Sequence, residues 1–144
     1  MNKLRLAIII LAVAGLADSA YLTWLKLQLM EQGLSCGFGG CDVVNASPYA
    51  VLFGVPVALW GAITYAVILA LALFWFDASA KWARWLVLSV VAVSAWGFLF
   101  SAYLTGVELF VLYAVCPFCV VSATIITLIL GLSIVALWRE SRTG

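Results

Sequence analysis

Long apolar runs separated by short polar breaks dominate this chain. Four runs are long enough to cross a bilayer, because a helical span takes about 20 residues at a rise of ~1.5 Å per residue. They cover residues 6–29, 55–76, 82–104 and 109–138. Residues 33–48, between the first two runs, are rich in Gly, Ser and Asn, as is typical of a loop. The pattern predicts an all-α integral membrane protein: one transmembrane domain over residues 1–144, a four-helix bundle with an outer loop at about 30–54.

Composition supports this class of protein and excludes others. Apolar residues make up 67% of the chain and charged residues 9%, with a mean hydropathy of +1.24, outside the range of soluble domains. A net charge of +1 without a basic patch argues against nucleic-acid binding. The chain has no histidine, which removes the commonest general base and metal ligand. The basic N-terminus resembles a signal peptide, but no clear cleavage site follows it, so we expect a retained first span.

Basic residues predict the orientation, because cytoplasmic flanks of membrane helices are enriched in Lys and Arg. One side of the predicted bundle carries almost all of them: Lys3, Arg5, Lys81, Arg84, Arg139 and Arg142. Only Lys26 lies toward the other side. We therefore expect both termini to be inside (N-in/C-in) in a multi-pass protein of the inner cell membrane. The first loop and the start of the fourth helix then meet at the extracytoplasmic face.

Four cysteines form two close pairs at that face. Cys116 and Cys119 sit two residues apart around Pro117, at a helix start, where unpaired N–H groups and the helix dipole favour a thiolate. We expect Cys116 near the helix cap and Cys119 one turn deeper, toward the lipid. Cys36 and Cys41 lie in the glycine-rich loop, where an exposed disulfide exchanges readily. The arrangement predicts a relay from an outside thiol through both pairs to a membrane acceptor.

The acceptor is constrained by what the sequence lacks. It contains no nucleotide-binding glycine fingerprint and no histidine for haem. A lipid-soluble quinone, of ubiquinone or menaquinone type, is the natural two-electron acceptor for a dithiol. We therefore expect a membrane thiol:quinone oxidoreductase that supports disulfide bond formation.

Three stretches carry a resemblance to a known family: residues 17–23 (ADSAYLT), 41–50 (CDVVNASPYA) and 116–119 (CPFC). With four spans and this order of cysteine pairs, the chain resembles the bacterial branch of the vitamin K epoxide reductase family over nearly its whole length. The resemblance implies that Cys36 meets a thioredoxin-fold partner, Cys41 attacks Cys116, and Cys119 faces the quinone. It also implies that Ser47, which matches a family hydroxyl, lies near the active site. Phe118 is a candidate quinone contact by its position.

The sequence departs from the family pattern in two ways. Vertebrate members contact the quinone through an asparagine and a tyrosine, whose positions here correspond to Ala50 and Ala123. We therefore expect quinone reduction rather than reduction of vitamin K epoxide. Many bacterial members also carry a fused thioredoxin domain, and none follows Arg142 in this sequence. The resemblance then implies a separate extracytoplasmic partner.

Other interpretations of the same residues remain open at this stage. The cysteines would be structural staples in a non-catalytic membrane subunit, or ligands of a four-thiolate zinc site, although we expect no metal. The disulfide bond formation protein B family uses the same chemistry but has its two pairs in the reverse order. We expect Asp18 to be interfacial or bundle-facing, with proton delivery as the alternative, and Lys26 to snorkel to the interface. Glu108 is expected to be a solvated boundary residue.

Overall fold

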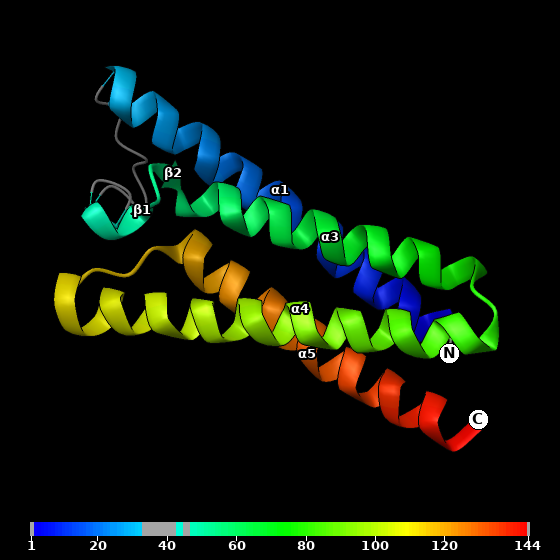
Figure 1. The fold of residues 1–144 in the computed structure, drawn as a ribbon. Coiled ribbons are helices and arrows are strands. Elements are labelled where there is room, and N and C mark those ends of the chain that lie inside the picture. The colour runs from blue at the N-terminus through cyan, green and yellow to red at the C-terminus, as the bar shows by residue number, and fades with distance from the viewer. Residues whose placement is uncertain (1, 33–42, 45–46, 144) are drawn as a thin grey trace.

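Four long helices make up most of the structure, a computed structural model that describes residues 2–32, 43–44 and 47–143 (Figure 1). Each contains an apolar stretch long enough to span a membrane, with mean hydropathies from 1.9 to 2.6. The predicted all-α fold with four spans is therefore confirmed in length and composition. The helices are α1 (Asn2–Gln32), α3 (Val57–Asp77), α4 (Ala80–Val107) and α5 (Pro117–Thr143).

The helices form a closed bundle. α1 packs against α3 and α5, and α4 packs against the same two helices from the other side. Both termini lie at one end of the bundle, together with the turn between α3 and α4 (Figure 1). The connections from α1 to α3 and from α4 to α5 therefore lie at the opposite end, which is also where the candidate chemistry lies.

Short elements precede α3 at this second end. A 3-10 turn, η1 (Pro48–Ala50), leads into a two-stranded antiparallel hairpin of β1 (Val51–Leu52) and β2 (Val55–Pro56). The two residues of its turn, Phe53 and Gly54, have φ angles of 55° and 77°. Positive φ at both positions gives a turn whose twist matches that of the strands, and glycine adopts this conformation without strain. The hairpin is a small departure from the all-α prediction.

The junction between α4 and α5 differs from the prediction. The expected break at 105–108 is wrong, because α4 continues to Val107 and then runs into a π-helix, η2 (Glu108–Leu112). Tyr113 ends this segment with a φ of 52°, and α5 begins at Pro117 rather than at Leu109. Thr105 and Gly106 carry no strong stop signal, whereas proline is preset for the first helical position.

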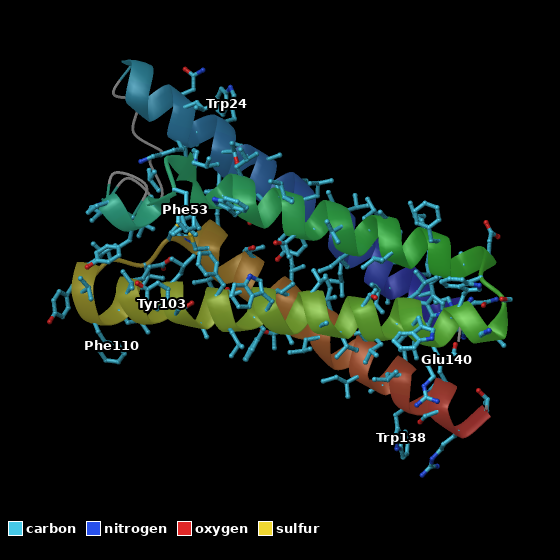
Figure 2. All side chains as sticks on the ribbon, in the orientation of Figure 1. Trp24, Phe53, Tyr103, Phe110, Trp138 and Glu140 are labelled. Atoms are coloured by element: carbon cyan, nitrogen blue, oxygen red, sulfur yellow. The ribbon has the colours of Figure 1, made fainter. Side chains whose placement is uncertain are left out.

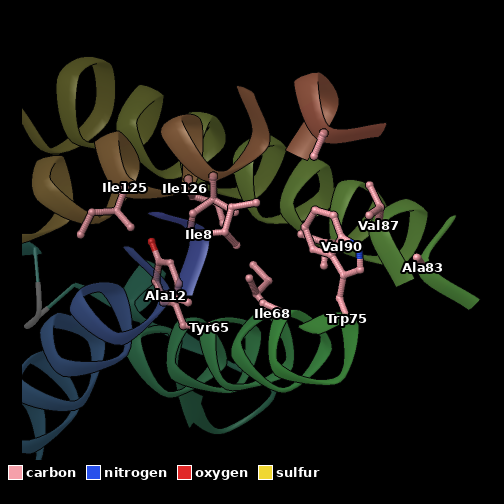
Figure 3. Packing of buried hydrophobic residues seen from close by; sticks show 13 residues of the cluster. Ile8, Ala12, Tyr65, Ile68, Trp75, Ala83, Val87, Val90, Ile125 and Ile126 are labelled. Atoms are coloured by element: carbon pink, nitrogen blue, oxygen red, sulfur yellow. The ribbon is translucent and has the colours of Figure 1, made fainter. Parts of the chain in front are cut away.

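Apolar side chains fill the half of the bundle nearest the termini. Every helix contributes to this core, and its fully buried members include Ile8, Ile68, Trp75, Val87 and Ile129 (Figure 3). Lipid tails are as apolar as these side chains, so leaving the lipid gives little hydrophobic gain. Close van der Waals packing between the helices is therefore what holds them together. The other half of the bundle is not filled in this way.

Aromatic side chains mark both ends of the bundle. Trp24, Phe53, Tyr103 and Phe110 lie toward the end that holds the loops, and Trp138 lies near the C-terminus (Figure 2). All five are more than half exposed. Tyr and Trp are favoured at membrane–water interfaces, so this distribution fits a bundle whose two ends reach the two headgroup regions.

The contact between Gly15 of α1 and Tyr65 of α3 predicts a clear effect on stability. A Cβ atom added at Gly15 would overlap the ring of Tyr65, whereas one added at Gly131 meets nothing within 4 Å. Gly15→Ala is expected to lower the free energy of unfolding by about 1–3 kcal/mol, the usual cost of overpacking. The matched control, Gly131→Ala, should be neutral or stabilising by up to about 1 kcal/mol. Tryptophan fluorescence during denaturation in micelles measures both; equal stabilities would show that Tyr65 moves aside without cost.

Candidate active site

A cavity of about 320 Å³ opens between the four helices at the end away from the termini. This volume is in the range of small-molecule sites. Its wall is largely apolar and aromatic, and the residues that give it this character include Phe53, Trp60, Trp96, Phe100 and Leu104. Such a cavity suits a flat, apolar ligand that enters from the lipid.

The Cys-x-x-Cys pair lies at the N-terminus of α5, as predicted. Cys116 is the residue before the first helical position, and its carbonyl accepts the Val120 N–H at 3.1 Å. Its side chain is fully buried. Cys119 lies one turn further along, is partly buried, and contributes to the wall of the cavity. The two thiols therefore occupy different environments, with the second one open to a ligand.

Cys116 is packed among residues from α1, the α1–α3 connection, α3 and α5. It forms a small cluster with Leu22 of α1, and Val44, Ala58 and Phe118 pack against that cluster. Val44 belongs to the connection between α1 and α3, so the described part of this connection reaches the buried cysteine. Cys36 and Cys41, the other predicted pair, lie outside the described residues.

Glu108 is the residue that most changes the picture of the site. The expectation that it is solvated is wrong, because it is only 4% exposed and contributes to the wall of the cavity. Its Oε2 accepts a hydrogen bond from the backbone N–H of Cys116 at 3.3 Å. The Cys119 side chain contributes to the wall of the same cavity. The π-helix turns the side chain inward, toward the start of α5.

The charged residues of α1 also differ in their surroundings. Lys26 does not snorkel to the interface as expected; it is 7% exposed and contributes to the cavity wall. Asp18 is partly buried, as expected of a bundle-facing residue, and does not line the cavity. Its Oδ2 is shielded and has no hydrogen-bond partner among the described residues. Whether Asp18 delivers protons stays a prediction.

The remaining predicted contacts are distributed unevenly around the cavity. Ser47 is buried at its edge, and its hydroxyl donates to the Val44 carbonyl at 2.7 Å. Ala50 lines the cavity, whereas Ala123 does not. Phe118 also lies outside the cavity wall and packs on Tyr21, with ring centroids 5.1 Å apart. Roles for Ser47 and Phe118 toward a quinone stay predictions.

Tyr65 is a polar residue of the cavity that was not predicted from the sequence. Tyr65 of α3 lines the cavity and its hydroxyl donates to the Ser122 carbonyl of α5 at 2.8 Å. The Ser122 hydroxyl lies 3.0 Å from the Tyr65 hydroxyl oxygen. A hydroxyl buried in an apolar bundle needs such partners, and here they join the two helices that flank the site.

A vicinal dithiol at a helix N-terminus, beside an apolar cavity in a membrane bundle, defines the class of membrane-embedded thiol–disulfide oxidoreductases. Comparison with known proteins narrows the class to one family. Residues 6–134 match the vitamin K epoxide reductase family. The chain therefore belongs to this oxidoreductase family.

A curated plant relative supports the assignment. The Thiol-disulfide oxidoreductase LTO1 of Arabidopsis thaliana is 44% identical to this chain over 54 residues. The matched segment spans 38% of this chain and 14% of the plant protein. The match thus covers only a small part of the plant protein.

Proposed function

We propose that this protein is a membrane thiol:quinone oxidoreductase, which oxidises an extracytoplasmic thioredoxin-fold donor and passes two electrons to a membrane quinone. The observation that carries the proposal is the position of Cys119, a thiol in the wall of an apolar cavity, one helical turn from Cys116. A ubiquinone- or menaquinone-type head group is flat, apolar and lipid-borne, so this cavity suits it. Quinone use and a thioredoxin-fold donor are also what membership of the family implies.

The electron path proposed begins in the loop between α1 and α3. Cys36 exchanges with the donor, Cys41 then attacks Cys116, and the resulting Cys116–Cys119 dithiol reduces the quinone. Chain connectivity supports the second step. Val44, in the described part of the same connection, packs against the Cys116 cluster. Ser47 and Phe118 are proposed as further contributors near the quinone.

The proposed orientation places this chemistry outside the cytoplasm. The basic residues cluster near the termini and the α3–α4 turn, which Figure 1 shows together at one end, and the positive-inside rule assigns that end to the cytoplasm. The dithiols then face the compartment where disulfides form and persist.

Oriented membrane vesicles test the function and its orientation together. Right-side-out vesicles given a reduced thioredoxin-fold donor and a quinone should form one quinol per donor disulfide. Inverted vesicles should do so only after detergent opens them. Turnover in inverted vesicles alone would refute the orientation. No quinol in either preparation, with or without detergent, would refute the function and favour a non-catalytic subunit with structural disulfides.

A further inference from the structure

The site contains a buried carboxylate that the electron path does not use. Glu108 is 4% exposed in a bundle with a largely apolar cavity, where burial of a carboxylate costs free energy unless donors compensate it. Its Oε2 accepts the Cys116 N–H at 3.3 Å, and the Cys119 thiol lines the same cavity. The carboxylate is therefore hydrogen-bonded to the backbone of one member of the dithiol and shares a cavity with the other.

Backbone hydrogen bonds to preceding and following residues fix the main chain of Glu108, which carries this carboxylate. The Glu108 N–H donates to the carbonyls of Leu104 and Thr105, and its own carbonyl accepts the N–H groups of Tyr113 and Ala114. The residue also begins the π-helix, an element that is frequent at functional sites. A catalytic group needs such fixed positioning, because small displacements weaken proton transfer.

Oxidation of the dithiol by a quinone requires proton transfer as well as electron transfer. When the S–S bond between Cys116 and Cys119 forms, two S–H bonds break and two electrons leave. The quinone takes up both electrons and two protons as its carbonyl oxygens become hydroxyls. A base that receives a thiol proton and an acid that protonates the quinone are both needed, and water is scarce in an apolar cavity.

We propose that Glu108 is this proton carrier: it accepts the thiol proton of Cys119 as the disulfide forms and returns it to a quinone oxygen in the same cavity. The carboxylate ends each cycle unchanged, and the second proton comes from the Cys116 thiol. This inference rests on the proposed thiol:quinone reaction. The other titratable side chains that line the cavity are Lys26, Tyr49, Tyr65 and Cys119.

A purely structural role for Glu108 would explain the same contacts. The substitution Glu108→Gln distinguishes that role from proton transfer. Glutamine at position 108 keeps an oxygen that accepts the Cys116 N–H, but it does not carry a proton. Glu108→Asp keeps the carboxylate on a shorter side chain. The matched control is Asp77→Asn, an exposed carboxylate at the end of α3, remote from the cavity.

The test is a single-turnover measurement on the full chain in nanodiscs. The reduced protein is mixed with a short-chain quinone, and absorbance reports quinol formation from pH 6 to pH 9. Glu108→Gln is expected to slow the step about 10²-fold or more at neutral pH, the range of general acid–base catalysis. The deficit should shrink as the pH rises and solvent deprotonates the thiol. Half-saturating quinone concentration should change little, Glu108→Asp should recover much of the rate, and Asp77→Asn should match the wild type.

Each other outcome overturns the proposal. A Glu108→Gln rate and pH profile equal to wild type would show that no proton passes through this residue. Equal losses in the Gln and Asp variants, with lowered melting temperatures, would make Glu108 a structural residue. If the wild-type chain itself forms no quinol, both the proposed function and the proton carrier are refuted. In the first two outcomes the wild-type chain does form quinol, so the proposed function survives and only the role of Glu108 is refuted.

Discussion

Replacement of Cys119 with serine is expected to abolish quinone reduction, a loss of more than about 10³-fold. Cys119 is the member of the pair that lines the cavity, and a hydroxyl neither forms a disulfide with Cys116 nor supplies electrons to a quinone. Serine is close to cysteine in size, so the packing around the start of α5 should persist. Quinone absorbance under steady supply of a reduced thioredoxin-fold donor measures the effect.

The control for this change is Val120→Ser, which introduces the same side chain at the next position of α5. Val120 is 44% exposed and does not line the cavity, so turnover should stay near that of wild type. Cys119→Ser should still form a mixed disulfide with the donor, since the loop cysteines remain. Undiminished turnover in Cys119→Ser would exclude this thiol as the electron donor to quinone.

The second large effect is expected from Cys41→Ala, which should trap the donor on the protein. When the donor is supplied in its oxidised form, the Cys36 thiolate attacks the donor disulfide and forms a mixed disulfide, and without Cys41 no neighbouring loop thiol remains to displace the donor from Cys36. Most of the chain should then migrate as a covalent complex on non-reducing gels after exposure to the oxidised donor. Peptide mapping of the complex should locate the cross-link at Cys36.

The double variant Cys36→Ala/Cys41→Ala serves as the comparison and should give no complex. A cross-link at Cys119 in the single variant would reverse the proposed order of transfer. Reduction of the gel sample should release intact donor, which separates a disulfide from nonspecific aggregation.

The arrangement of the fold follows closely from the sequence. Apolar runs of span length predicted the four helices, and the turn after Asp77 and the loop before α3 lie where polar residues gather. The α4–α5 junction was predicted poorly for a physical reason. The more polar stretch 105–108 (TGVE) favours a break, but the helical path continues through it as α4 and η2 and ends at Tyr113, whose φ is positive; the π-helix itself has no clear signature in the sequence.

The position of Cys116 and Cys119 at a helix start was predictable from the sequence, whereas the surroundings of the charged residues were less so. Cysteine spacing and Pro117 predicted a helix start, which α5 confirms. Glu108 was expected to be solvated because it stood at a predicted break; once α4 runs through that break, the same residue is buried. Its signal was present, since an ionisable residue in a membrane segment is a functional candidate by default. Lys26 was misjudged similarly, because a flexible side chain reaches inward as easily as outward.

The close-packed half of the bundle has a consequence for energy coupling. Around the fully buried Trp75 and Ile129, the buried polar side chains described are the uncharged hydroxyls of Ser94 and Ser133, 3.5 Å apart, so we expect the proposed reaction to use the other end of the bundle. Electrons from the donor and the protons that accompany them would then enter and leave at one face, without net charge movement across the bilayer. Catalysis of this kind is electroneutral, and its rate should be indifferent to the membrane potential.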